Sequence, residues 1–147
     1  MTIITYTDGG CSGNPGPGAW AYIIVREGRR FEQSGFEAAT TNNRMELTAV
    51  IESLVAVSKH GEWIEDSIEI HTDSQYVHNG INNWIDKWER NGWQTSQKKP
   101  VKNQDLWKRL KELTKPIDIV WHWVRGHHGN ELNEACDRLV KKRIASS

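Results

Sequence analysis

The chain has 147 residues, of which 37% are hydrophobic and 26% are charged, and its formal net charge is zero. These values predict one folded domain over residues 1–147 with its own core, and they exclude a disordered chain. No apolar run approaches the roughly 20 residues of a membrane-spanning helix, and the first residues lack the pattern of a signal peptide. The two cysteines, Cys11 and Cys136, form neither a zinc motif nor a disulfide framework. We therefore expect a protein of a reducing, cytoplasmic compartment with no membrane contact.

The zero net charge is unevenly distributed along the chain. Residues 1–73 carry 5 Lys and Arg against 11 Asp and Glu, whereas residues 74–147 carry 14 against 8. The first half thus has a net charge of −6 and the second half a net charge of +6. Such a split suggests that one half holds a metal cation and the other half holds a polyanion.

Five segments have the composition of strands, because they are rich in β-branched residues or alternate apolar with polar residues. They are residues 2–7, 19–25, 30–37, 67–72 and 117–124. The first three are joined by short turns, which predicts an antiparallel meander. The first strand is expected to end at Asp8 and the fourth at Asp73.

The other periodic segments have the helical spacing of apolar residues. They are residues 43–59, 74–90 (one or two short helices broken near Gly80), 104–114 and 131–144. Thr41 and Ser74 are candidate N-caps, and residues 91–102 and 126–130 are expected to be loops. This order predicts an α/β fold, with a five-stranded mixed sheet flanked by helices. The sheet would consist of the antiparallel meander and two further strands.

Four acidic residues occupy positions from which they could reach one site. Asp8 and Asp73 follow strands, and ligand sites in open α/β sheets form just outside the strand ends. Glu46 and Asp137 each border the apolar stripe of a helix. Clustered carboxylates need cations to offset their repulsion, and an all-oxygen donor set suits Mg²⁺ or Mn²⁺ rather than Zn²⁺. The alternative is that these acids are surface residues and turn formers, since the chain has 19 Asp and Glu.

The most basic stretch of the chain also contains tryptophans. Residues 84–111 carry eight Lys and Arg against three Asp and Glu. Basic side chains bind phosphates and aromatic faces pack on bases, which favours a nucleic-acid surface that includes Lys98, Lys99 and Trp84. Trp88 and Trp107 lie at helical positions and are better explained as core residues.

Three further polar segments could contact such a ligand. The glycine-rich residues 9–18 do not match a nucleotide P-loop, but they would let the backbone approach a substrate closely. Residues 41–43 (Thr-Asn-Asn) offer donors at a helix start, either to a phosphate or sugar hydroxyl or simply to the helix itself. His127 and His128 lie in a glycine-flanked loop, where either could move protons beside a metal site or be an inert surface residue.

Six motifs along the chain resemble those of one known family. They are TDGGCSGNPGPG at 7–18, TTNNRMEL at 40–47, TDSQYV at 72–77, KKPVKN at 98–103, WVRGHHGN at 123–130 and NEACD at 133–137. In these motifs, which run in order through nearly the whole sequence, the chain resembles bacterial type 1 ribonuclease H (ribonuclease HI). The resemblance implies a ribonuclease H-like fold and endonucleolytic cleavage of the RNA strand of an RNA–DNA hybrid. The products would be a 5′-phosphate and a 3′-hydroxyl.

The resemblance also implies roles for individual residues. The metal-binding and catalytic acids match Asp8, Glu46, Asp73 and Asp137, which would use two Mg²⁺ ions per site with substrate bound, with Mn²⁺ as a substitute. His127, which directly follows the WVRG motif, matches the loop histidine that assists proton transfer or product release. The implied substrate contacts are Cys11, Gly13, Asn14, Asn42 and Gln75 for the RNA strand, Tyr76 and Trp84 for the DNA strand, Thr41, Asn43 and Asn103 for a phosphate pocket, and Lys98 and Lys99 within a basic protrusion at residues 84–102.

Two function classes remain open at this point. The first is the metal-dependent nuclease, acting as a monomer on an RNA–DNA hybrid with no obligate protein partner. The second is a catalytically inactive nucleic-acid-binding module of the same fold. The intact set of four acids argues against the second class, because a pure binder gains nothing from carboxylates that face phosphates.

Overall fold

The computed structural model describes residues 2–63, 65–124 and 130–146, and within them a five-stranded mixed sheet. Its strands are β1 (Thr2–Cys11), β2 (Gly16–Arg26), β3 (Arg29–Thr40), β4 (Ser67–Thr72) and β5 (Ile119–Trp123). They lie in the order β3-β2-β1-β4-β5. Strands β1, β2 and β3 form the antiparallel meander, while β4 pairs in parallel with both β1 and β5. The predicted fold class and the predicted mixed sheet are therefore confirmed.

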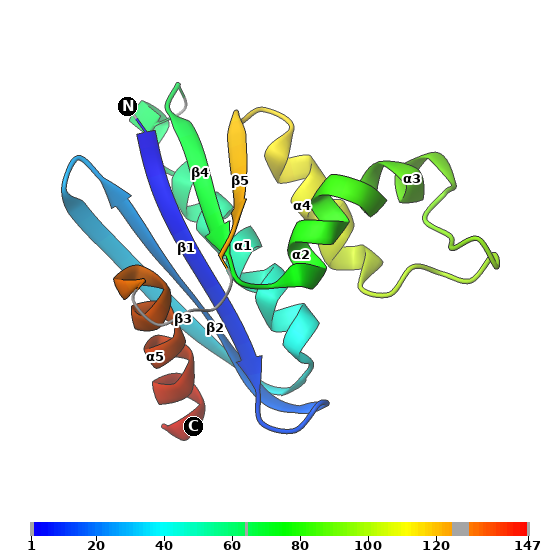
Figure 1. Ribbon diagram of the computed structural model, residues 1–147, viewed down its shortest axis with the longest axis horizontal. Coiled ribbons are helices and arrows are strands. Elements are labelled where there is room, and N and C mark those ends of the chain that lie inside the picture. Colours follow the sequence, from blue (N-terminus) through cyan, green and yellow to red (C-terminus); the bar gives the residue numbers. More distant parts are fainter. Residues whose placement is uncertain (1, 64, 125–129, 147) are drawn as a thin grey trace.

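Helices pack on both faces of this sheet (Figure 1). They are α1 (Asn42–Ser58), α2 (Gln75–Asn79), α3 (Ile85–Arg90), α4 (Gln104–Thr114) and α5 (Glu131–Ala145), with a 3₁₀ turn at Gly61–Trp63 and a π-helical turn at Gly80–Trp84. Helix α1 packs on one face and contacts α4, whereas α5 packs on the other face over β1, β2 and β3. Helices α2 and α3 and the loop after them project from one side of the sheet.

Two apolar clusters hold these layers together. The larger cluster lies between the sheet and helices α1 and α4, and it includes Ile3, Leu54 and Trp107. The smaller cluster lies under α5 and includes Ile23 and Cys136. Burial of apolar surface on both faces fixes the sheet between its helices, so side chains at the strand ends are held on a rigid support.

Strand β1 is longer than its composition predicts. It continues through Asp8 to Cys11, because its last residues pair with the start of β2, where Cys11 faces Gly18. The expectation that this strand ends at Asp8 is therefore wrong. Only its parallel pairing with β4 stops there, at Thr7 beside Thr72.

The segment after β4 is continuous where a break at Gly80 was expected. Ser74 caps α2 as predicted, because its Oγ accepts a hydrogen bond from the amide of Val77 at 3.2 Å. A Cβ atom at Gly80 would lie 2.1 Å from the indole of Trp107, so only glycine allows this close packing on α4. The helix accommodates the contact by widening into the π-helical turn rather than by ending.

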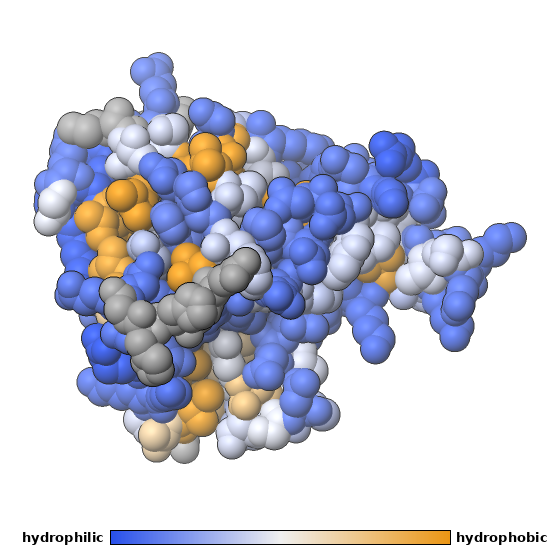
Figure 2. All heavy atoms as spheres, viewed as in Figure 1, coloured by the Kyte–Doolittle hydropathy of each residue, from blue (hydrophilic) through white to orange (hydrophobic). Residues whose placement is uncertain are grey.

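The projecting part of the molecule has a strongly polar surface. Figure 2 shows mainly hydrophilic residues, with paler patches between them, over the segment that extends from the sheet. Among the described ranges, no helix is long and apolar enough to cross a membrane.

Candidate active site

The pairing of the two central parallel strands brings Asp8 and Asp73 to one place. Thr7 of β1 lies beside Thr72 of β4 in the last pair of this parallel ladder, and each threonine is followed at the next position by one of the two acids. The carboxyl ends of parallel strands meet at one edge, which is where open α/β sheets place ligands. This pairing confirms the expected proximity of Asp8 and Asp73, although Asp8 lies inside β1.

Glu46 joins these two residues because α1 crosses β1 at a glycine. A Cβ atom at Gly9 would lie 2.3 Å from the carbonyl carbon of Met45 and 2.4 Å from the amide nitrogen of Glu46. Real side chains do not tolerate such distances, so only glycine permits this approach. Thr41 caps the same helix through a 3.3 Å hydrogen bond from the amide of Arg44 to its Oγ1, which fixes the first turn that carries Glu46.

Asp8, Glu46 and Asp73 form what we call the carboxylate trio. One carboxylate oxygen from each lies within 4.8 Å of the other two. Asp8 and Glu46 are only 6% and 9% exposed, and the Oε1 atom of Glu46 has no hydrogen-bond partner among the described residues. Burying several carboxylates together is unfavourable unless a cation offsets their charge, so the trio has the composition and burial expected of a cation site.

The electrostatics of the trio are strongly perturbed. Burial raises the pKa of Asp8 to about 8, with the charges of Asp73 and Asp137 adding to the effect. Burial, and then the charges of Asp8 and Asp73, raise the pKa of Glu46 well above its ordinary value. The pKa of Asp73 is also raised, chiefly by burial. A divalent cation would reverse these shifts by stabilising the ionised forms.

Asp137, the fourth predicted acid, lies apart from the trio. Asp137 lies on α5 and its side chain is 47% exposed. Its Oδ2 forms an ion pair with Nζ of Lys141 at 2.9 Å. Its negative charge still contributes to the raised pKa values of Asp8 and Asp73. The structure therefore places Asp137 within electrostatic reach of the trio but engaged with a lysine one turn along its own helix.

The donor chemistry of the trio fits magnesium. All of its available ligand atoms are carboxylate oxygens, which Mg²⁺ and Mn²⁺ prefer. The thiol of Cys136, which lies within electrostatic reach of the trio, donates to the carbonyl oxygens of Tyr6 and Ala21 at 3.3 and 3.8 Å. Burial raises the pKa of this thiol, so it stays protonated and is a poor metal ligand.

The predicted RNA-contacting loop is joined to the start of α1. The backbone amide of Asn42 donates to Oδ1 of Asn14 at 3.1 Å. The thiol of Cys11 donates to the carbonyl oxygens of Gly16 and Thr40 at 3.2 and 3.3 Å, and Gly13 has a φ of +81°, which suits only glycine. The loop after β1 and the N-terminus of α1 thus form one polar surface beside the trio.

Asn103 and Tyr76, assigned by the resemblance to a phosphate pocket and to the DNA strand, are hydrogen-bonded to each other. The side-chain amide of Asn103 donates to the Tyr76 hydroxyl at 3.1 Å, and the indole N–H of Trp107 donates to the same oxygen at 3.0 Å. Arg44 donates to Oδ1 of Asn103 at 3.2 Å and also pairs with both carboxylate oxygens of Asp105. These bonds hold a polar group of α4 against α1 and α2.

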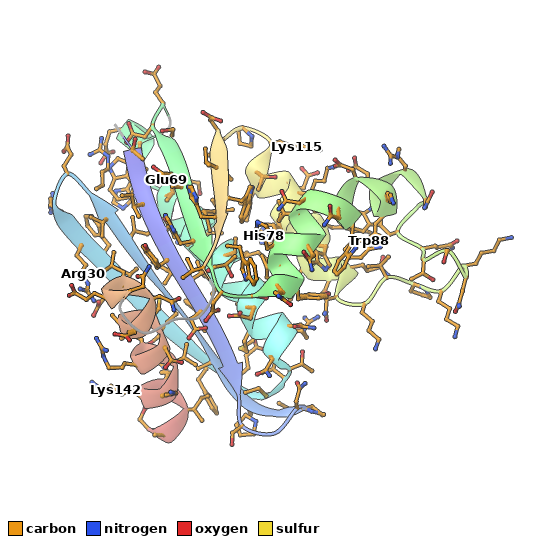
Figure 3. The ribbon with its side chains drawn as sticks, viewed as in Figure 1. Arg30, Glu69, His78, Trp88, Lys115 and Lys142 are labelled. Carbon is orange, nitrogen blue, oxygen red and sulfur yellow. The ribbon has the colours of Figure 1, made fainter. Side chains whose placement is uncertain are left out.

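Residues 84–102, which we call the basic ridge, carry tryptophans at their base and lysines at their tip. Trp88, labelled in Figure 3, packs against Trp84, and its ring meets that of Trp107 edge-on at a centroid distance of 5.4 Å. Trp107 is fully buried, which confirms its predicted core role, and Trp88 packs partly buried against the same cluster. Lys98 and Lys99 are exposed.

The remaining predicted site residues divide into two groups. Asn43 and Gln75 are exposed at the starts of α1 and α2, from where they can reach a ligand. His127, and the loop expected at residues 126–130 except its last residue, lie outside the described residues.

The sequence did not reveal two features of this site. Arg44, which links α1 to Asn103 and Asp105, has no spacing signal, because its partners lie about 60 positions away along the chain. The close approach at Gly9 was hidden within a segment that was assigned to a turn. A glycine directly after a strand-borne acid is the one signal that could have indicated it.

Comparison with protein families gives a match to the RNase H family model over residues 1–145. Among curated proteins, the chain is 52% identical to a ribonuclease H of Treponema denticola, over 95% of each chain. It is 50% identical to a ribonuclease H of Phenylobacterium zucineum, over 99% of this chain and 92% of the relative.

Solved structures of similar fold include three that are described as RNase H1. The structure of LC9-RNase H1, described as a type 1 RNase H with the type 2 active-site motif, matches with a TM-score of 0.86 at 30% identity, over 99% of this chain and 72% of that one. LC11-RNase H1 in complex with an RNA/DNA hybrid matches with a TM-score of 0.77 at 25% identity, over 98% and 97%. RNase H1 of the archaeon Halobacterium salinarum matches with a TM-score of 0.67 at 28% identity, over the full length of both chains.

Proposed function

Since this chain belongs to the RNase H family, we propose that it is an endonuclease that hydrolyses the RNA strand of RNA–DNA hybrids. The observation that carries the proposal is the carboxylate trio, in which Asp8 and Glu46 are buried, Asp73 is partly buried, and one oxygen of each residue lies within 4.8 Å of the other two. A relative of the same fold has been crystallised with an RNA/DNA hybrid, which supports the substrate class.

In this proposal the trio holds divalent metal, Mg²⁺ or Mn²⁺, with Asp137 as a further acidic ligand. Two such ions would activate the attacking water and stabilise the leaving oxygen in an in-line displacement at phosphorus. The bond from phosphorus to the 3′ oxygen breaks and the water oxygen takes its place, so the products are a 5′-phosphate and a 3′-hydroxyl. The ion pair with Lys141 at 2.9 Å uses Oδ2 of Asp137, so Oδ1 would be the oxygen that binds metal while the pair is kept.

The polar surface beside the trio would distinguish RNA from DNA. RNA carries a 2′-hydroxyl, which short polar side chains and backbone groups can contact in a wide, shallow minor groove. Asn14 and Asn42 form part of one such surface, where they are hydrogen-bonded to each other. Cys11 and Gly13, from the same motif as Asn14, and Gln75, from the motif at 72–77, are the other proposed RNA contacts. The proposed DNA-strand contacts are Tyr76 and Trp84, with Thr41, Asn43 and Asn103 holding a phosphate.

The basic ridge would contribute charge rather than sequence recognition. Lys98 and Lys99 are exposed at its tip and can contact phosphates without reading bases. His127 is proposed to assist proton transfer or product release. The proposal further includes one catalytic domain over residues 1–147, acting as a monomer in the cytoplasm.

The direct test is cleavage of an end-labelled RNA–DNA hybrid in the presence of Mg²⁺ or of EDTA, beside RNA–RNA and DNA–DNA duplexes. We expect cutting of the RNA strand of the hybrid alone, and only with metal, and the labelled fragments should carry 3′-hydroxyl ends. Tight hybrid binding without cutting in Mg²⁺ or Mn²⁺ would instead identify a binding module of the same fold.

A further inference from the structure

A second cluster of metal-ligating side chains lies on the sheet face opposite α1. Glu69 and His71 are two positions apart on β4, so they point to the same face. His122 of β5 is the direct cross-strand neighbour of His71. The buried side chains Ile68 and Ile70 point the other way, toward α1 and α4.

Within the part of the chain that the structure describes, this part of the face is accessible to solvent. Helix α5 covers the meander, and in the described ranges no helix covers the same face of β4 and β5 (Figure 1). The His122 side chain is 41% exposed, and Val120, two positions before it on the same face, is also exposed. Figure 3 shows Glu69 on β4 toward the viewer, with α1 behind the sheet. The three side chains can therefore rearrange around an ion that arrives from solvent.

The three residues already lie close together. Nε2 of His122 is 3.0 Å from Oε1 of Glu69, and one potential ligand atom of each residue lies within 4.8 Å of the other two. The rings of His71 and His122 are stacked with centroids 4.5 Å apart. Metal–ligand bonds of about 2.0–2.2 Å separate the ligands of a tetrahedral ion by roughly 3.3 Å. Small side-chain rotations, which unstack the two rings, would bring all three donors to that spacing.

We propose that Glu69, His71 and His122 form a second metal site, which binds a divalent transition ion of the zinc class. Two imidazole nitrogens and one carboxylate oxygen are the donors that Zn²⁺, Ni²⁺ and Cu²⁺ prefer, and they leave further positions open for water. The all-oxygen trio at Asp8 has the opposite preference, for Mg²⁺. The two sites would thus select different ions on one sheet. An ion in the second site would also join β5, an edge strand, to β4.

The cluster has a matched control within the same chain. His60 is 40% exposed and lies 3.6 Å from Glu62, and its ring stacks on Trp63. It is therefore a surface histidine with a carboxylate neighbour and an aromatic neighbour, and it belongs to neither group of three potential ligands found in the described ranges. If a histidine–carboxylate pair were enough to hold zinc, His60 would do so as well.

The test is a Zn²⁺ titration of the full-length chain against a chromophoric chelator, with Mg²⁺ in excess to occupy the trio. Removal of a supporting group around a bound metal typically costs 10–100-fold in affinity, and removal of a direct ligand should cost at least as much. We expect His122→Gln and Glu69→Gln each to weaken Zn²⁺ binding by about tenfold or more. Glu69→Gln keeps the size of the side chain and one oxygen that can accept the hydrogen bond from His122, so it separates lost ligation from a damaged fold.

Three comparisons decide the outcome. His60→Gln and Asp8→Asn should leave Zn²⁺ affinity unchanged, and Co²⁺ bound to the unaltered chain should give a visible absorption band that His122→Gln removes. Zn²⁺ should also raise the thermal midpoint of the unaltered chain and not that of His122→Gln. The proposal is overturned if His122→Gln binds Zn²⁺ as tightly as the unaltered chain, if Asp8→Asn alone abolishes binding, or if His60→Gln weakens it equally.

Discussion

The carboxylate trio and the basic ridge carry opposite charges and are built in opposite ways. The packing of the core positions the trio. The parallel pairing of β1 and β4 positions Asp8 and Asp73, and the close approach of α1 at Gly9 positions Glu46. In the basic ridge, exposed lysines extend beyond a base of tryptophans that pack on one another. Metal catalysis requires ligands fixed to a fraction of an ångström, whereas a phosphate backbone requires only positive charge within reach.

The two regions also manage their charges differently. The trio keeps like charges together, and burial raises the pKa values of its members. At the base of the ridge, opposite charges are paired instead: Nζ of Lys111 lies 2.6 Å from Asp86 and 3.3 Å from Glu89. A substitution in the trio should therefore change chemistry and folding together, while one in the ridge should change binding alone.

The largest effect is expected from Asp8→Asn. Loss of one metal ligand removes several kcal/mol of transition-state stabilisation, so hybrid cleavage should fall by on the order of 10³-fold. Because asparagine is neutral without binding a proton, the variant avoids the cost of keeping Asp8 protonated beside its acidic neighbours and should be more stable than the unaltered chain in EDTA near neutral pH. Single-turnover cleavage and urea unfolding measure the two effects. Asp118→Asn, at an exposed position, is the control and should change neither. A strongly destabilised Asp8→Asn variant would show that the trio is a structural cluster.

The next effect is the pH dependence of the metal-free protein. The pKa of Asp8 is about 8 in the folded chain against an ordinary value of 3.8, so between these values the folded state holds a proton that the unfolded state has lost. Stability in EDTA should therefore decrease as pH rises through this window, by at most about 1.4 kcal/mol per pH unit. In urea unfolding from about pH 4.5 to 8.5, the free energy of unfolding of Asp8→Asn should increase relative to that of the unaltered chain as pH rises. A difference in the free energy of unfolding that stays constant with pH would contradict the raised pKa of Asp8.

Gly9→Ala should separate the geometry of the trio from its charge. The new methyl group would meet the backbone of α1 at 2.3–2.4 Å, so the helix must shift and carry Glu46 with it. Overpacking of this kind costs about 1–3 kcal/mol of stability, and cleavage should fall by about 10²-fold from misplacement alone. Gly61→Ala, where nothing lies within 4 Å of the added methyl, is the control. An active Gly9→Ala variant with unchanged stability would disprove the close approach.

Lys99→Ala should affect the ridge without affecting the chemistry. Loss of one phosphate contact should weaken hybrid binding similarly for all sequences and reduce the slope of log affinity against log salt by about 1. Cleavage at saturating hybrid should be unchanged, and so should the free energy of unfolding, because the side chain is exposed. Binding isotherms at several salt concentrations measure the slope, and an unchanged slope would place Lys99 away from the nucleic acid.

The smallest effect is expected from Asp86→Asn. This change releases Lys111 from its shorter ion pair, so the net positive charge at the base of the ridge increases by one. Hybrid affinity at low salt should rise a few-fold, and the gain should disappear at high salt because exposed charges are screened. Affinity measured at two salt concentrations is sufficient. Glu112→Gln, which removes the partner that pairs with Lys115 at 3.0 Å, is the control. A gain that persists at high salt would rule out an electrostatic origin.

Much of this fold could be predicted because its signals are local. Alternation identified the strand before Asp73 with correct bounds, and the capping roles of Thr41 and Ser74 followed from their side-chain chemistry. The length of β1 could not be predicted, because Gly9 and Gly10 have turn composition and are held in strand form by β2. Pairing across the sheet outweighs the local preference of these glycines.

The site was predictable in its residue types and less so in its geometry. Asp8, Glu46 and Asp73 were identified from strand ends and a helix face, and the structure brings them together. Their partners depend on register, which one sequence does not reveal. The juxtaposition of His71 and His122 is such a case, because it requires β4 and β5 to be neighbours in parallel register.

Two neighbouring side chains determine whether the Tyr76 hydroxyl can donate or accept a hydrogen bond to a ligand. A phenol oxygen can accept two hydrogen bonds and donate one. Asn103 and Trp107 both donate to it, which fills its accepting capacity. The hydroxyl hydrogen remains, so Tyr76 can form a hydrogen bond with an incoming ligand only as the donor. A phosphate oxygen satisfies that requirement, and the amino group of a base does not.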